Sequence, residues 1–228
     1  MLGFYDYTVI LTYMSLASSI IGMFCAFSGH LHLAITCLAL SGLFDTFDGK
    51  VARTKKNRTE EEKHFGIQID SLCDVICFGV LPVIICYFTG LQDVPSMGIL
   101  ILYCLAGLIR LAYFNVIEER RQKETSEKRK YYQGLPITSI SVILPLVYVG
   151  SFLYEQSFLI VLRLVMLLTA VLFIGNFRFR KPNNKELAIL IGVVAVAVVY
   201  ILLFFRWRHI QWSWRDVFHL FRRARGGS

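Results

Sequence analysis

The chain has little charge and few residues that interrupt hydrophobic segments. Only 18% of its 228 residues are Asp, Glu, Lys or Arg, and it has five prolines. Instead, 56% of the residues are hydrophobic, in apolar runs of about twenty residues that recur along the chain. A soluble domain of this length would alternate polar and apolar positions, so the sequence excludes one. We expect an all-α, polytopic bundle of about seven transmembrane helices.

The apolar runs predict where these helices lie, although six or eight spans would also fit. The helices are expected near residues 8–27, 32–51, 66–89, 97–117, 136–154, 158–176 and 187–205. The connectors are too short for a soluble domain, so residues 1–205 form one membrane-embedded domain. Residues 206–228 form a basic, aromatic tail, interpreted either as a helix lying in the membrane interface or as a frayed terminus.

Cysteine is missing from the predicted loops, because all six cysteines fall within spans. Loop cysteines build disulfide frameworks, and a zinc site needs further Cys or His ligands at a matching spacing. Neither pattern is present, so we interpret the cysteines as small hydrophobic residues of the helix core. The segment before the first span also lacks Lys and Arg, so no cleaved signal peptide is expected.

Lysine and arginine are missing from three connectors and concentrated in three others. The connectors without them are 28–31, 90–96 and 155–157, and the basic ones are 52–65, 118–135 and 177–186. The basic connectors follow the second, fourth and sixth spans and share one side, which the positive-inside rule places in the cytoplasm. Seven spans put the arginine-rich tail on the other side, against the same rule.

The net charge of +8 comes from these connectors and from the tail. Such segments beside a membrane attract anionic lipid headgroups, so membrane lipids are expected partners. Nucleic acid is not an expected partner, because the basic residues are spread between spans rather than gathered on one soluble face.

Four aspartates stand inside or at the edges of the second and third apolar runs. A carboxylate at bilayer depth costs at least about 2.5–3.5 kcal/mol unless a cation, a partner or a water-filled cavity compensates it. Asp45 and Asp48 share one face of the second helix, and Asp70 and Asp74 share one face of the third. The chain reverses between them, so both pairs are expected to face one cleft near the cytoplasmic surface.

Carboxylates in this number suit Mg²⁺ or Mn²⁺, which prefer hard oxygen ligands. Four exceed what one ion needs but would hold two ions that clamp a pyrophosphate. Gly49, Ala52 and Gly66 lack bulk, so a flat nucleotide would approach the helix backbones closely. Arg53 offers a planar donor fork for phosphate. The pattern predicts a two-metal nucleotide site.

Two other interpretations of the aspartates stay open at this point. A single intramembrane carboxylate is often just paired with a neighbouring cation, and Lys50 or Arg53 could serve. Buried carboxylates also line the cation or proton pathways of transporters. Against a transporter, the four are concentrated beside one loop, and the sequence shows no inverted repeat.

The segment from Asp45 to Asp74 resembles the signature of the CDP-alcohol phosphatidyltransferase family, Asp-x2-Asp-Gly-x2-Ala-Arg followed by Gly-x3-Asp-x3-Asp. All eight fixed positions are filled, although the spacer 54–65 is longer than is common in the family. Three segments also resemble the phosphatidylserine synthase branch of the family. They are Phe65 to Pro82, which ends in Phe78-Gly79-x2-Pro82, then Arg110-Leu-Ala-Tyr-Phe-Asn115, and Gln133-Gly-Leu-Pro-Ile-Thr138.

The resemblance implies the family's helical fold, a homodimer and two bound Mg²⁺ or Mn²⁺ ions. It implies an enzyme that transfers a phosphatidyl group from CDP-diacylglycerol to the hydroxyl of L-serine, giving phosphatidylserine and CMP. Asp45, Asp48 and Asp70 would be the main metal ligands. Asp74 would lie near the second metal and act as the general base.

Further residues are assigned on the same resemblance. The first span lacks the Pro-Asn often seen in relatives, so its serines, with Ser18 chosen among them, are the candidates for contacting the nucleotide. Arg110 stands in an apolar span and is expected to face inward. With Asn115 and Gln133 it is a candidate for binding the acceptor or the lipid phosphate, and Arg110 could instead neutralise an aspartate.

The acceptor and the donor stay open within the family. Inositol, inositol phosphate or glycerol phosphate would each define a sister enzyme, and an archaeal ether lipid is compatible as the donor. A cation or proton transporter is the alternative from a different class of protein.

Overall fold

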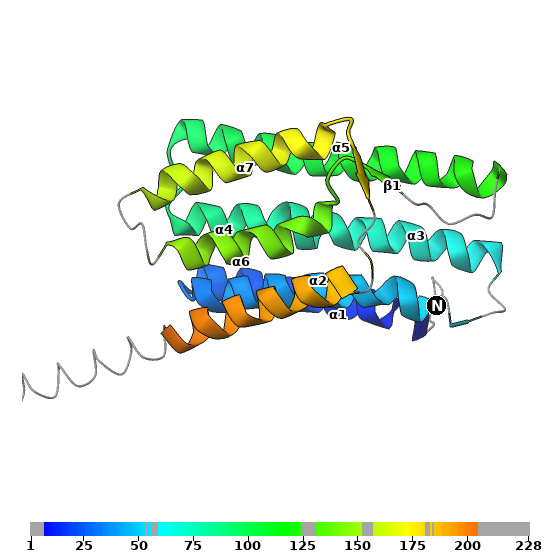
Figure 1. Cartoon of the computed structure of the whole chain (residues 1–228), viewed down its shortest axis with the longest axis horizontal. Coiled ribbons are helices and arrows are strands. Elements are labelled where there is room, and N and C mark those ends of the chain that lie inside the picture. The colour runs from blue at the N-terminus through cyan, green and yellow to red at the C-terminus, as the bar shows by residue number, and fades with distance from the viewer. Residues whose placement is uncertain are drawn as a thin grey trace, which may run out of the picture.

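The computed structural model describes residues 7–52, 54–55, 59–124, 131–151, 157–180, 183 and 185–204. In this part, five helices are long and apolar enough to cross a membrane, and two shorter apolar helices lie alongside them (Figure 1). Their outer faces carry exposed large hydrophobic side chains such as Ile109, Leu168 and Leu203. Apolar surface on this scale suits lipid rather than water, so the protein is an integral membrane protein.

The helices run back and forth along the bundle, with short connections between most of them. The first elements are the 3₁₀ turn Tyr7–Val9, α1 (Ile10–Phe27), α2 (Leu31–Ala52), α3 (Glu60–Asp74), a π-helical segment (Val75–Val80) and α4 (Leu81–Thr89). There follow α5 (Val94–Glu124), β1 (Tyr131–Gln133), the 3₁₀ turn Ile137–Ser139, α6 (Ile140–Gly150), α7 (Phe158–Ile174), β2 (Arg178–Arg180) and the helix Lys185–Phe204. α3, the π-helical segment and α4 form one continuous rod.

The helical architecture and the order of the seven predicted helices are confirmed, with some boundaries moved. The third helix, expected from residue 66, begins at Glu60 because Thr59 caps it. The Thr59 hydroxyl accepts the Glu62 N–H at 3.1 Å, and the Glu62 carboxylate accepts the Thr59 N–H at 3.1 Å. This capping box satisfies backbone donors at the helix start. The helix expected at 97–117 extends to Glu124, and the two short strands were not predicted.

Buried serines join α1 to α2. Ser15 Oγ donates to the Ser41 carbonyl at 3.1 Å, and Ser41 Oγ donates back to the Ser15 carbonyl at 2.9 Å. The hydroxyls of Ser19 and Ser41 lie 2.8 Å apart. Because small polar residues let helix backbones approach closely in an apolar bundle, these bonds fix α2 against α1. They hold the helix that carries Asp45 and Asp48.

β1 and β2 pair as a two-stranded antiparallel ribbon just beyond the end of α7, and α3 and α5 extend past it (Figure 1). Beside it, the Gly134 N–H donates to the Phe177 carbonyl at 2.7 Å, and the Leu135 N–H donates to the Leu172 carbonyl at 3.2 Å. Gly134 has φ of +70°, and a Cβ there would lie 2.8 Å from the Gly175 carbonyl oxygen. Only glycine fits this turn without strain. The turn sets where α6 begins relative to the end of α7.

At the opposite end of the bundle, an ion pair ties α7 to the start of α5. Arg163 Nη2 lies 2.7 Å from Asp93 Oδ1, and Arg163 Nε donates to Ser96 Oγ at 2.7 Å. The Ser96 hydroxyl, which donates to Asp93, and the Arg163 charge lower the pKa of Asp93. An arginine in an apolar helix needs such partners, and this one finds them far from the four aspartates.

Substitution of Gly134 tests this packing, with Gly29 as a matched control. Both glycines have positive φ, +70° and +79°, but a Cβ at Gly29 meets nothing within 4 Å. We expect Gly29→Ala to cost about 1–2 kcal/mol for the left-handed backbone alone. Gly134→Ala should cost more, because the Gly175 carbonyl must also move. Thermal unfolding of both variants in one detergent measures this difference, and equal shifts would contradict the close packing at Gly134.

Candidate active site

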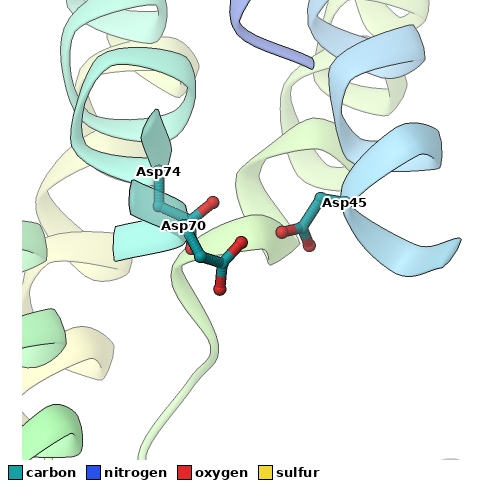
Figure 2. A group of neighbouring side chains, drawn as sticks. All are labelled: Asp45, Asp70 and Asp74. Atoms are coloured by element: carbon teal, nitrogen blue, oxygen red, sulfur yellow. The ribbon is translucent and has the colours of Figure 1, made fainter. Parts of the chain in front are cut away.

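Three carboxylates meet where α2 faces α3. Asp45 on α2 and Asp70 and Asp74 on α3 each offer an oxygen atom, and these oxygens all lie within 4.8 Å of one another. Figure 2 shows Asp45 reaching across from its helix toward the other two. Asp70 and Asp74 share one face because they are four residues apart on a helix. The two aspartate-bearing faces therefore converge.

The three carboxylates open into a cavity of about 360 Å³ beside the turn between β1 and α6. The cavity is lined by Asp45 and Asp48 from α2, by Ile67, Asp70, Ser71 and Asp74 from α3, by Arg110, Leu111, Phe114 and Asn115 from α5, and by Pro136, Ile137 and Thr138 before α6. It thus combines four carboxylates, one guanidinium and several neutral polar groups in a partly apolar wall. Such a mixture is typical of a ligand site.

Asp48 lines the cavity beside the group of three. Its Oδ2 accepts a hydrogen bond from Thr12 Oγ1 at 3.3 Å. Its charge still acts on Asp45 and Asp70. Thr12, which is buried on α1, was not predicted as a site residue. Its position in the sequence could have indicated this role. Thr12 lies nearly two helical turns closer than Ser18 to the N-terminal end of α1, which is the end near the aspartates.

Repulsion among the carboxylates is not balanced by the polar groups around them. The Asp70 Oδ1 atom is buried and has no hydrogen-bond partner among the described residues. Asp74, only 9% exposed, faces the charges of Asp45, Asp70 and Asp48. Like charges out of water destabilise one another strongly. An unpaired carboxylate oxygen beside two further carboxylates is a donor set that fits a hard divalent cation.

Arg110 lies inside the bundle, on the α5 side of the cavity. Its side chain is 6% exposed. Its Nε donates to the Leu135 carbonyl at 3.1 Å and its Nη2 to the Gly134 carbonyl at 3.4 Å. The guanidinium also lies 5.3 Å from the centroid of the Phe114 ring. These contacts fix the guanidinium beside the cavity and connect it to the turn before α6.

Asn115 is held one turn further along α5. Its Nδ2 donates to Ser71 Oγ at 2.8 Å, which joins α5 to α3. Ser71 follows Asp70 directly, so this hydrogen bond also supports the aspartate-bearing turn. Both residues line the cavity.

The residues predicted to contact a nucleotide lie in two different places. Gly49 is exposed near the end of α2, and a Cβ there would meet no atom within 4 Å. Ala52 is partly exposed as the last residue of α2, and Gly66 is partly exposed near the middle of α3. Ser18, by contrast, is buried between α1 and α2, where it donates to the Cys37 carbonyl at 3.0 Å. It does not line the cavity.

Some predictions fall outside the described residues. Arg53, the expected phosphate ligand, lies there, as does the tail 206–228. Gln133 is described by its backbone, as the last residue of β1, and not by its side chain.

Comparison with known proteins agrees with this geometry. Residues 8–175 match the sequence model of the family described as CDP-alcohol phosphatidyltransferase. A CDP-diacylglycerol–serine O-phosphatidyltransferase of Helicobacter pylori is 30% identical over 207 residues, which are 88% of this chain and 82% of the relative. The archaetidylserine synthase of Methanothermobacter thermautotrophicus is 30% identical over 77% of this chain and 70% of its own length.

A third relative, the CDP-diacylglycerol–serine O-phosphatidyltransferase of Saccharomyces cerevisiae, is 39% identical over 113 residues. That match covers 49% of this chain but only 40% of the yeast protein. The family match spans the helices α1 to α7 and all four aspartates. The chain therefore belongs to the CDP-alcohol phosphatidyltransferase family.

Proposed function

We propose that the protein transfers a phosphatidyl group from CDP-diacylglycerol to the hydroxyl of L-serine, giving phosphatidylserine and CMP. The observation that carries this proposal is the convergence of the signature aspartates, with oxygens of Asp45, Asp70 and Asp74 within 4.8 Å of one another in one cavity. The relatives from H. pylori and S. cerevisiae are named for this reaction. The cavity is also lined by the positively charged side chain of Arg110, which suits the carboxylate of an amino-acid acceptor.

In this proposal, Asp45, Asp48 and Asp70 would hold two Mg²⁺ or Mn²⁺ ions, and Asp74 would lie near the second. The Oδ1 atom of Asp70 supports metal binding, since it is buried and has no hydrogen-bond partner among the described residues. Thr12 keeps the Asp48 carboxylate turned toward the cavity. Bound divalent ions supply positive charge to the pyrophosphate and to the leaving CMP.

The donor lipid lies with its acyl chains in the bilayer and its pyrophosphate at the aspartates. The cytidine end is placed against α2 and α3, where Gly49, Ala52 and Gly66 leave the backbone uncovered. The open space beside Gly49 supports this placement. Arg53 is proposed to bind a phosphate oxygen through its planar donor fork.

Asp74 is the proposed general base. It takes the proton from the serine hydroxyl while the hydroxyl oxygen forms a bond to the phosphorus attached to diacylglycerol. The bond between that phosphorus and the bridging oxygen breaks, and its electron pair leaves with CMP. Asp74 lines the cavity next to Asp70 and faces three other carboxylates. Nearby cations would keep it ionised and able to accept the proton.

Arg110 and Asn115 form the proposed acceptor side of the cavity, with Gln133 as a further candidate. Two backbone carbonyls and the Phe114 ring orient the Arg110 guanidinium before a ligand arrives. A fixed guanidinium pairs well with a carboxylate. We assign it to the carboxylate of L-serine rather than to the lipid phosphate or to an aspartate.

We also propose that the site faces the cytoplasm and that the protein forms a homodimer. The helix ends that precede the basic connectors, which are the C-terminal ends of α2, α5 and α7, point toward the same end of the bundle, and Asp45 and Asp48 lie in the last turns of α2 (Figure 1). The positive-inside rule supports a cytoplasmic position for that end. Family membership supports the dimer.

A direct assay tests the reaction. Purified full-length protein in mixed micelles with CDP-diacylglycerol should release CMP only when L-serine and Mg²⁺ or Mn²⁺ are both present, and a chelator should stop the release. Release with inositol, inositol phosphate or glycerol 3-phosphate instead would refute the acceptor. An ether-lipid donor belongs in the same assay, because one relative is named for archaetidylserine. Cation flux into proteoliposomes without CMP would indicate a transporter.

Asp74→Asn tests the general base. Loss of a positioned base should lower kcat at least about 100-fold. Binding of CDP-diacylglycerol should be partly retained, because the other three aspartates remain. Asp93→Asn is the matched control, since Asp93 lies at the opposite end of the bundle and pairs with Arg163. Near-normal turnover of Asp74→Asn would show that another group accepts the proton.

Arg110→Lys tests the acceptor site by separating the two substrates. Loss of a bidentate contact should raise the KM for L-serine about 10–100-fold. The KM for CDP-diacylglycerol should change little. Arg163→Lys is the control, because Arg163 is remote from the cavity. A rise confined to the KM for CDP-diacylglycerol would assign Arg110 to the lipid phosphate instead.

A further inference from the structure

The rod that carries Asp70 and Asp74 changes its helical type directly after Asp74. The Val75 N–H donates to the Ser71 carbonyl four residues back, as in an α-helix. By the end of the following segment, the Leu81 N–H donates to the Ile76 carbonyl, five residues back. A π-helical turn of this kind holds about one extra residue and occurs frequently at functional sites. Asp74 is thus the last residue of the regular helix.

Pro82 follows the π-helical segment and removes a backbone donor. The pairing changes here from five residues back to four, so an N–H at residue 82 would serve the carbonyl of Cys77 or of Phe78, but proline has no N–H. Phe78 is completely buried. A buried carbonyl without a donor is costly in an apolar bundle, where water does not replace the missing bond.

Tyr103 on α5 supplies a donor to this carbonyl. Its hydroxyl donates to the Phe78 carbonyl oxygen at 2.6 Å, and its side chain is completely buried. The Tyr103 ring packs against Phe173 of α7, with ring centroids 5.5 Å apart. The hydroxyl is therefore held in place by two neighbouring helices.

We propose that Tyr103 is a positioning residue for the carboxylate cluster, acting through the Phe78 carbonyl and the π-helical turn. In a helix, a shift of one residue rotates a side chain by about 100°. A rearrangement of this turn would move Asp74 away from Asp45, which lies on another helix. The Tyr103 hydroxyl sets the helical phase at which Asp74 and Asp70 meet Asp45. The inference rests on the proposed metal-dependent function.

This role also explains a motif that the proposed reaction leaves unused. Phe78, Gly79 and Pro82 belong to the segment that resembles the phosphatidylserine synthase branch, yet none of them lines the cavity. In the structure, Phe78 provides the carbonyl that Tyr103 binds, and Pro82 removes a backbone donor at the same junction.

Tyr103→Phe removes the hydroxyl and leaves the ring packing unchanged. Binding of Mn²⁺ to the full-length protein in detergent, without substrates, is measured from the loss of the free-ion paramagnetic resonance signal. We expect the dissociation constant to rise about 10-fold, equivalent to about 1.4 kcal/mol, and CMP release to fall in parallel. Tyr87→Phe, which removes a hydroxyl from the exposed side of α4, should change neither.

A second control variant separates positioning from general destabilisation. Gly29→Ala, which is expected to destabilise the protein at the turn between α1 and α2, should keep Mn²⁺ binding within about 2-fold of wild type at a temperature where both variants remain folded. Unchanged Mn²⁺ binding in Tyr103→Phe overturns the inference, and so does an equal loss of Mn²⁺ binding in Tyr103→Phe and Gly29→Ala. Wild-type protein that binds Mn²⁺ but releases no CMP with any acceptor refutes the proposed reaction and leaves the positioning role intact.

Discussion

Several carboxylates held together inside an apolar bundle are the constraint on which the rest of this structure depends. Oxygens of Asp45, Asp70 and Asp74 lie within 4.8 Å of one another, and Asp48 lines the same cavity. Like charges in a medium of low polarity repel strongly, and the described polar neighbours leave one Asp70 oxygen without a partner. The arrangement makes sense as the site of divalent cations, which agrees with the membership of the chain in a family of phosphatidyltransferases.

The surrounding bundle keeps these carboxylates in place by satisfying polar groups at each contact. Serine hydroxyls on α1 and α2 bond to backbone carbonyls on the facing helix. The Asn115 amide joins α5 to the turn that carries Asp70, and Arg110 bonds to two carbonyls before α6. In lipid, a polar group cannot form a hydrogen bond to water instead. Each of these hydrogen bonds therefore also favours one relative position of two helices. Catalytic geometry and helix packing thus rest on the same contacts.

Much of the fold could be predicted from the sequence, as could the convergence of the aspartates, whereas the contacts of the α1 side chains could not. The spans follow from runs of apolar residues, and the convergence of Asp45 with Asp70 and Asp74 follows from their spacing. Ser18 was chosen for the nucleotide, but it bonds to α2, while Thr12 reaches Asp48. Which polar residue of α1 faces the cavity depends on how α1 crosses α2, and that angle leaves no mark in either sequence segment.

The sequence alone determined what depends on near neighbours along the chain: the approximate position of each span, the face on which each pair of aspartates lies, and the signature that identifies the family. These follow from the rise and period of the helix, which are local properties. Only the tertiary structure decided that Tyr103 donates to Phe78, that Gly134 must fit against Gly175, and that Arg110 faces the aspartates. Those contacts join residues far apart in the chain, and they exist because packing brings particular helices side by side.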